Sequence, residues 1–334
     1  MDPELKPAGL HPLRTPLSFF STMALRAEKL RVSVQVRQAH LVRNGTPDIE
    51  TEKLHELLTP VEDFIDGHLR TCLDEHPTRH WWSRISGMVS KKTGLPLEPL
   101  GKLIGEIERF GRWYQPDDPM VPIETPMHLL TKELKDSIAS PGGRRIVYTD
   151  EVGHPWVWVS AIERLTTTSK LWRYAGLVPG QKRVKGEKLD FNGTVKTMAF
   201  RVAQFGCILP GNPYKALFDR YKERKALDLA EAGVSIKATP KARWCEKCQK
   251  PAGSATTKFC GDCGSKLTTH EEPEGEMYKG HLNNMAVRYM SKMFLSHLHT
   301  VWREALGLSV RPPYPVEHRG HQTIITPWDM CDLP

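Results

Sequence analysis

Long apolar runs are missing from this sequence, which has no stretch of the roughly 18 residues that a membrane-spanning helix needs. The first residues, MDPELKPAGLHPLRTPLSFFS, also lack the apolar segment of a signal peptide. Four of the seven cysteines lie between positions 245 and 263, while Cys72, Cys207 and Cys331 are isolated, so the pattern does not suit a disulfide framework. We therefore expect a cytoplasmic protein with reduced thiols and no membrane partner.

The chain has fewer acidic than basic residues, with 39 Asp and Glu and 47 Lys and Arg, so its formal net charge is +8. A basic excess favours a polyanionic partner, most simply a nucleic acid, although an ordinary basic soluble protein has the same charge. The excess is concentrated between positions 170 and 225, where thirteen Lys or Arg face four Asp or Glu. Four cations make up the centre of this stretch, which we call the basic segment: Lys182, Arg183, Lys185 and Lys188.

Four cysteines form the sharpest pattern in the chain. They read Cys-x2-Cys, eleven residues, Cys-x2-Cys, and they are Cys245, Cys248, Cys260 and Cys263. This spacing lets four thiolates reach one tetrahedral ion, and Gly261 and Gly264 suit the tight turns, so we predict a structural Zn²⁺ ribbon. The alternative is a pair of redox motifs, which open a helix in a βαβ unit, and nothing around Cys245 has that pattern.

Outside the cysteines, the chain shows mostly helical periodicity, and 39 % hydrophobic residues are enough for a core. The proline-rich start is expected to be poorly ordered. The ribbon interrupts a helical domain, so the domain has two parts. The predicted boundaries are 1–20 for the disordered N-terminus, 21–75 for a helical hairpin or coiled-coil arm, 76–240 for the first part of the helical domain, 241–272 for the zinc ribbon, 273–315 for its last helix and 316–334 for the tail.

The arm is predicted to contain helices over 22–43 and 51–74. Pro60 predicts a kink or a break in the second helix. In the first helix, the alternation of Leu30, Val32, Val34 and Val36 leaves a strand as the alternative.

The helical domain is expected to open with a helix, a glycine-containing turn and a second helix over residues 85–107. Free backbone N–H groups at such a turn suit a phosphate, although an ordinary helix pair has the same pattern. Residues 111–155 are rich in Pro, Gly and Asp and predict a lid loop with a short hairpin at 144–153.

Three further helical stretches follow along the chain. The stretch 166–180 contains a helix capped by Thr168 or Ser169, and 192–232 is helical with a break at 209–211. The strongest periodicity, over 281–306, predicts a buried helix. In the tail, His318 and His321 offer a second metal site, with simple packing as the alternative.

Several segments, in their order along the chain, carry a resemblance to one family. They are HPTRHWW (76–82), SKLWRYAGLVPG (169–180), KGEKLDFNGTVKTMAF (185–200), NPYKALFDRYKERK (212–225) and MAVRYMSKMFLSHLHTVWRE (285–304). Together they resemble the C-terminal half of insertion-sequence transposases guided by a bridge RNA. That half is similar to the Nop domain of box C/D ribonucleoproteins and to the Tas proteins of TIGR arrays, and the resemblance covers residues 22–315 apart from the lid loop and the ribbon.

The resemblance implies a mainly α fold, with a helical coiled-coil arm and a helix-hairpin-helix, Nop-like helical domain into which the four-cysteine zinc ribbon is inserted. Two departures from the family bear on activity. The first 75 residues lack the strand that brings an acidic metal ligand in a RuvC-like nuclease domain. Residues 180–193, where the family has a nucleophilic serine, contain no Ser, Thr or Cys to form a covalent DNA linkage. We therefore expect no enzymatic activity.

The function that the resemblance implies is binding of a guide RNA in a ribonucleoprotein that targets DNA, in a prokaryote, a phage or a mobile element. Base pairing by the guide would supply sequence specificity, and the arm would make a homodimer, since an exposed apolar hairpin needs a partner. Trp172 and Tyr174 suit stacking on bases and equally suit the core. The expected nucleic-acid contacts are Trp172, Arg173, Tyr174, Lys182, Arg183, Lys185, Lys188, Asn192, Lys196 and Arg201.

Two other functions stay open at this point. One is a transposase or recombinase of the bridge-RNA family with divergent, inactive catalytic residues. The other is a zinc-ribbon protein that binds DNA without any RNA. Discrete short RNAs bound to the protein favour the guided complex over both.

Overall fold

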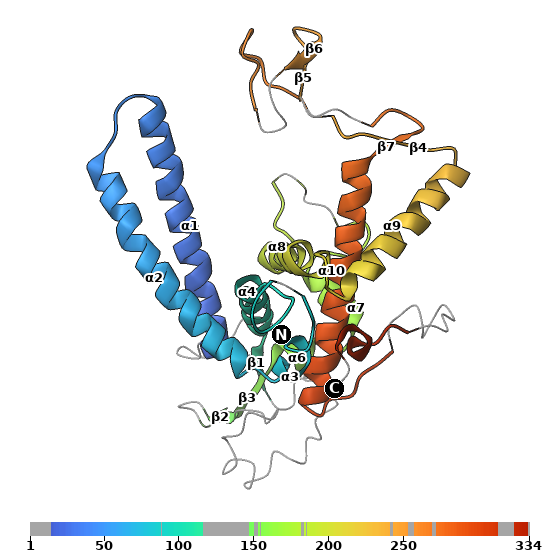
Figure 1. Ribbon diagram of the computed structural model, residues 1–334. Coiled ribbons are helices and arrows are strands. Elements are labelled where there is room, and N and C mark those ends of the chain that lie inside the picture. The colour runs from blue at the N-terminus through green and yellow to red at the C-terminus, as the bar shows by residue number, and fades with distance from the viewer. Residues whose placement is uncertain are drawn as a thin grey trace. The chain divides into compact units, whose positions relative to one another are not determined.

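The computed structural model describes residues 15–87, 89–115, 147–149, 153, 155–181, 184, 186–240, 243–252, 257–268, 272–312 and 324–332. The protein is mainly helical, as predicted (Figure 1). It divides into two compact units, Met1–Pro213 with Ser291–Pro334, and Tyr214–Met290. Among the described helices, none combines the length and the apolar composition that a membrane crossing requires.

The arm consists of α1 (Pro16–Arg43) and α2 (Ile49–Asp74). The two helices are antiparallel, because Arg31 pairs with Glu62 while Arg37, further along α1, donates to Thr51, earlier in α2, at 3.1 Å. Thr15 caps α1 by accepting a hydrogen bond from the backbone N–H of Ser18 at 3.0 Å.

One expected boundary of the arm needs correction, while both predicted helices are present. Residues 16–20 belong to α1 rather than to a disordered start, because Pro16 fits the first position of a capped helix. Residues 30–36 are helical and not a strand. Of the predicted kink or break at Pro60, the break does not occur, since the second helix continues through this exposed residue, where water can bond to the carbonyl that a proline leaves free.

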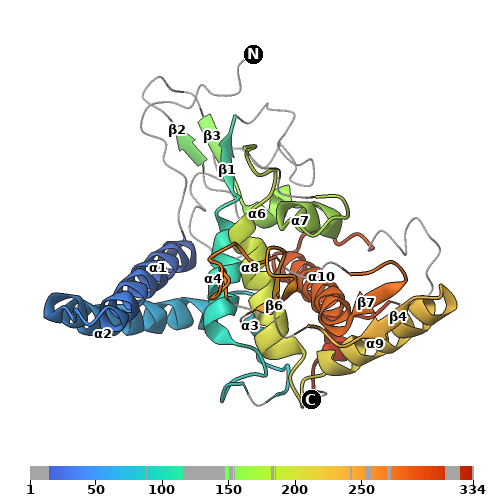
Figure 2. The ribbon, with the colours of Figure 1, turned by 90° about the horizontal axis from the view of Figure 1, so that it is seen from above.

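The core of the first unit is built on α4 (Leu97–Glu108), which packs against both arm helices and against α8 (Gly193–Val202) (Figure 2). Close packing depends on two glycines. A Cβ at Gly105 would lie 2.5 Å from the Ser21 side chain, and one at Gly101 would lie 2.9 Å from Leu69. The other helical elements of this unit are α3 (Arg79–Trp82), α6 (Ala161–Arg164), α7 (Thr168–Tyr174), the π-helical η2 (Ala203–Cys207) and the 3-10 helix η3 (Pro327–Met330).

The helix expected at the start of residues 85–107 does not form. The described residues of 85–96 make turns and bends, and only α4 is helical. The backbones of Gly87 and Gly94 touch, and the Gly94 N–H donates to the Ile85 carbonyl at 2.7 Å. A Cβ at Gly94 would lie 1.9 Å from the Ser86 oxygen, so this glycine pair closes a loop where the pattern predicted a helix.

A three-stranded antiparallel sheet stands where the lid loop was predicted. It contains β1 (Arg112–Tyr114), β2 (Val147–Thr149) and β3 (Pro155–Val159) in the order β1-β3-β2. The expected hairpin is therefore built by β2 and β3, and its second strand lies further along than 144–153. Residues 116–146 lie outside the described part of the chain.

The second unit contains α9 (Tyr214–Glu231) and the ribbon. The ribbon hairpin is formed by β5 (Arg243–Cys245) and β6 (Lys250–Ala252), and it is flanked by β4 (Ser235–Lys237) and β7 (Glu276–Tyr278), which pair in parallel. Thr239 accepts a hydrogen bond from the Gly280 N–H at 2.8 Å, at the start of α10 (Lys279–Ala305). Because β4 precedes the ribbon and β7 follows it, this pairing brings the start and the end of the ribbon together.

Candidate metal centre and candidate nucleic-acid interface

The four cysteines of the ribbon converge. Cys245 ends β5 and Cys248 lies in the turn that follows, while the turn after Cys260 is closed by Gly264, whose N–H donates to the Cys260 carbonyl at 2.9 Å. The φ angle of Gly264 is 67°, a value that favours glycine. All four Sγ atoms lie within 4.8 Å of one another.

The spacing of the sulfurs fits one tetrahedral ion. Cys245 Sγ lies 3.5 Å from Cys263 Sγ, and Cys248 Sγ lies 4.0 Å from Cys260 Sγ. Metal–sulfur bonds of about 2.3 Å in a tetrahedron place the sulfurs about 3.8 Å apart, between the two observed values. The cysteine cluster can therefore hold a metal ion with little rearrangement.

The ionisation of these thiols also favours a cation. Hydrogen bonds from Ser265 lower the pKa of the Cys263 thiol to about 6, which favours its thiolate form. A hydrogen bond between the Cys248 thiol and the Cys263 sulfur raises the pKa of Cys248 to about 12, because this bond stabilises the protonated thiol. A bound divalent cation would favour the ionised form of each thiol that it contacts and so let all four sulfurs ionise.

The ribbon has little core apart from its cysteines. Cys245, Cys260 and Leu267 are its buried cluster, against which Cys248, Cys263 and Ala252 pack. A module with so few buried apolar groups needs a cross-link or a metal to stay folded.

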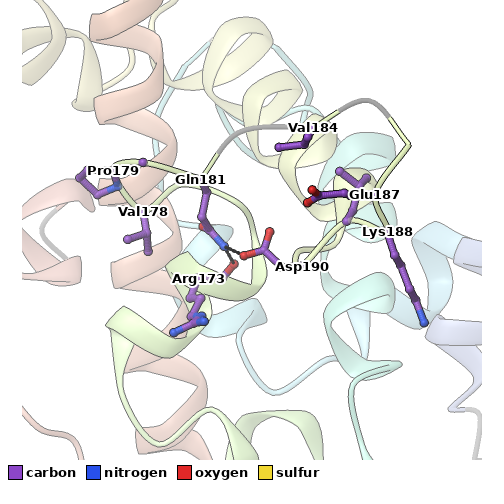
Figure 3. Close-up of a pocket in the computed structure, with 10 residues that line it drawn as sticks. Arg173, Val178, Pro179, Gln181, Val184, Glu187, Lys188 and Asp190 are labelled. Carbon is purple, nitrogen blue, oxygen red and sulfur yellow. Dashed lines mark hydrogen bonds between the residues drawn. The ribbon is translucent and has the colours of Figure 1, made fainter.

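A hollow of about 480 Å³ lies on the first unit where Arg173 meets the loop 178–190 (Figure 3). The side-chain amide of Gln181 ties the loop down by donating to the Arg173 carbonyl at 3.3 Å and to Asp190 at 3.1 Å. Arg173 and Lys188 are exposed at this loop hollow, and Glu187 and Asp190 also line it. The predicted contacts Lys182, Arg183 and Lys185 lie outside the described residues, as do His318 and His321.

Asn192 and Tyr174 form hydrogen bonds with each other where this loop meets α8. The Asn192 side-chain oxygen caps α8 by accepting from the N–H groups of Thr194 and Val195 at 2.9 and 3.1 Å. Its amide donates to the Tyr174 hydroxyl at 2.9 Å, and its backbone N–H donates to the Tyr174 carbonyl at 2.7 Å. Asn192 therefore joins α7 to α8.

Three other predicted contacts have partners within the protein. The Trp172 indole N–H donates to the Lys292 carbonyl at 3.1 Å, and the ring is half-buried. Lys196 lies over the Phe191 ring, 4.8 Å from its centre. Arg201 donates to Glu28 at 2.9 Å. Of the seven predicted contacts that lie in the described part of the chain, Arg173 and Lys188 line the loop hollow and are exposed.

Sequence reasoning missed a buried charge network in the same unit. Lys102 is fully buried in α4, and its ammonium donates to Glu28 of α1 at 2.9 Å and also pairs with Glu98. Burial raises the pKa of Glu28, but Lys102 and Arg201 outweigh it, so the pKa is lowered overall. A lysine on the apolar face of an amphipathic helix was the available signal.

Comparison of the chain with protein-family models, with curated proteins and with solved structures finds no match.

Proposed function

We propose that the protein binds a guide RNA and directs the resulting ribonucleoprotein to DNA, without a nuclease centre of its own. Arg173 and Lys188 stand exposed at the loop hollow, and this pair of cations carries the proposal. They belong to the most basic stretch of a chain whose net charge is +8. Clustered cations on one surface are the electrostatic signature of nucleic-acid binding.

The loop hollow suits a nucleotide in size and in chemistry. Its volume of about 480 Å³ is within the usual range for small-ligand sites. Arg173 and Lys188 can pair with phosphate oxygens, while Glu187 and Asp190 can accept hydrogen bonds from the exocyclic amino groups of bases. Mixed charges support a site that holds one or two nucleotides at a defined place.

The ribbon and the arm complete the proposal. We assign Zn²⁺ to the cysteine cluster, because four thiolates at tetrahedral spacing are the usual ligands of structural zinc. On α2, four exposed apolar residues follow the 3-4 spacing of a coiled-coil seam, and this α2 stripe supports a homodimer. Its members are Leu54, Leu57, Val61 and Phe64.

We further propose that the chain is not an enzyme. Residues 180–193, which resemble the nucleophile-bearing segment of the bridge-RNA transposases, have no hydroxyl or thiol side chain. The role left to this segment is to bind the nucleic acid.

The test is to express the protein with its flanking DNA, purify it at moderate salt and sequence the nucleic acid that stays bound. Discrete short RNAs encoded beside the gene support the proposal. Heterogeneous host fragments that high salt removes would contradict it and favour an RNA-independent DNA binder, and bound termini of a mobile element would favour a transposase.

The loop hollow is tested separately with the variants Arg173→Ala and Lys188→Ala. Each is expected to reduce the slope of log affinity against log salt by about one unit if its cation contacts a phosphate. Lys29→Ala is the matched control, since it removes an exposed lysine from α1. Equal slopes for all three variants and the wild type would place the nucleic acid elsewhere.

A further inference from the structure

The ribbon exposes an aromatic ring that its own fold does not use. Phe259 is 60 % exposed, although it directly precedes the buried ligand Cys260. In a module with so small a core, an apolar ring at the surface costs free energy unless it has a partner.

The register places a lysine beside this ring. Phe259 and Lys266 form an antiparallel bridge, flanked by hydrogen bonds from Leu267 N to Lys258 O and from Cys260 N to Ser265 O. This is the closely spaced kind of pair, in which both side chains stand on the same face. The next pair, Lys258 and Leu267, points to the opposite face, where Leu267 is buried. Phe259 and Lys266 therefore share the outer face of the ribbon.

The charge of the ribbon favours an anionic partner. Residues 243–268 contain five Lys or Arg and two Asp or Glu. Lys250, 2.8 Å from Asp262, neutralises one of the two acids. Lys266 and Lys258 are exposed and make no ion pair with any described residue. Zinc with four thiolates would carry a charge of about −2, which the cations of the ribbon offset.

We propose that Phe259 and Lys266 bind an unpaired nucleic-acid strand, with the ring stacked on a base and the ammonium paired with a phosphate. A phenyl ring has no hydrogen-bonding group, so it can hold a base only by its face, and the bases of a duplex are already stacked. This contact lies in the second unit and does not use the loop hollow. It shares with the proposed function only the premise that the ligand is a nucleic acid.

The test uses the full-length, zinc-loaded protein and three fluorescein-labelled probes of about 20 nucleotides, oligothymidylate, oligouridylate and a DNA duplex. Phe259→Ala is expected to weaken binding of the single strands about fivefold or more, since stacking on one base contributes about 1–3 kcal/mol. Binding of the duplex is expected to stay unchanged. Phe259→Trp is expected to retain the wild-type affinity, and zinc content measured for each variant confirms that the ribbon is folded.

The lysines provide a matched pair on opposite faces of one ribbon. Lys266→Ala is expected to reduce the salt slope for single strands by about 0.7, the value for one phosphate contact. Lys258→Ala removes the same charge from the other face and is expected to have a smaller effect. Equal effects would mean that only overall charge matters and would overturn the assignment of the face.

Other outcomes separate this inference from the proposed function. If Phe259→Ala leaves single-strand binding unchanged while Lys188→Ala weakens it, the inference fails and the proposed function stands. Equal losses for the single strands and the duplex, or no binding of the probes by the wild type, also overturn it. A change in molar mass of Phe259→Ala in solution would assign the ring to a second copy of the chain instead. Comparison of oligothymidylate with oligouridylate shows which kind of strand is preferred.

Discussion

At the scale of single residues, two neighbouring ionisable groups in the first unit have pKa values that are shifted in opposite directions. His76 Nε2 lies 3.7 Å from Glu108 Oε1, and both side chains are mostly buried. Burial lowers the pKa of His76 to about 3 and raises the pKa of Glu108 to about 7. The cost of burying a charge therefore outweighs the attraction that the ionised pair would gain.

These two pKa values predict the pH dependence of stability. The folded chain holds the Glu108 proton between its ordinary pKa of 4.5 and about 7, so Glu108 lowers the free energy of unfolding as pH rises through that window. The unfolded chain protonates His76 between its ordinary 6.5 and about 3, so His76 lowers stability as pH falls through that window. In Glu108→Gln, we expect the decline toward pH 7 to vanish and the acid loss to remain.

Urea unfolding at a series of pH values measures this difference. The wild type is expected to vary least between about pH 4.5 and 6.5, where the two groups act in opposite directions. A profile of Glu108→Gln that runs parallel to the wild type from pH 4.5 to 8 would contradict the prediction. His76→Gln is the complementary control, since it is expected to remove only the acid loss.

At the scale of elements, the arm exposes a row of apolar side chains, which is unusual for an isolated domain. The four residues of the α2 stripe are between 43 and 67 % exposed, and they occupy one side of the helix. The opposite charges that join α1 to α2 lie elsewhere, at Arg31 and Glu62 and at Arg37 and Asp48. The two arm helices are thus paired with each other, while the apolar α2 stripe stays exposed.

The α2 stripe predicts self-association through the arm. Leu57→Glu is expected to raise the dissociation constant of the dimer about tenfold or more, because burial of one leucine contributes about 1.5–3 kcal/mol. Light scattering coupled to size exclusion measures the molar mass across a concentration series. Thr59→Glu adds the same charge to an exposed position of α2 outside the stripe and is the control. A wild type that stays monomeric at every concentration would refute the prediction.

Helices were predictable from the sequence where periodicity is long, and the short elements were not. The stretch 281–306 predicted α10 closely, because its apolar residues repeat over many turns. The prediction of a first helix within 85–107 was wrong, since the contact between Gly87 and Gly94 is tertiary and leaves no local pattern. Strands β1 and β3 were missed, because three to five residues in a Pro- and Gly-rich region carry too weak a signal.

At the scale of the whole molecule, the candidate sites also differed in how far the sequence predicted them. The cysteine cluster was predicted completely, because the ligand spacing is a local property of the chain. The loop hollow was not, since it depends on how Gln181 ties the loop to Arg173 and Asp190. Asn192 stays a predicted nucleic-acid contact, and the structure adds a capping role at the start of α8.

Removal of the proposed zinc ion is expected to affect the two units differently. Structural zinc contributes about 10–16 kcal/mol in small modules, so a chelator should unfold the ribbon. The first unit holds its own buried core, including Trp81, Trp82 and Phe294, and is expected to keep its helices. Circular dichroism should change little while limited proteolysis opens new cleavage sites within 243–268.

Cys260→Ser provides the matched variant for this experiment. It is expected to reproduce the effect of the chelator without one, whereas Cys207→Ser changes a buried cysteine outside the ribbon and should keep the metal. Loss of most helical signal on chelation would show that the first unit depends on the ribbon and would contradict the prediction.

The pairing of β4 with β7 has a consequence for how such chains diversify. These strands run side by side in parallel, and Thr239 also bonds to Gly280. The two ends of the ribbon are therefore held together by contacts that involve neither the ribbon hairpin nor the cysteine cluster. A connection from the end of β4 to the start of β7 has to run back along the strand pair, a distance that about four residues can span. Another small domain grafted between Thr239 and Glu276 would therefore be expected to leave the β4–β7 pair and the hydrogen bond of Thr239 to Gly280 intact.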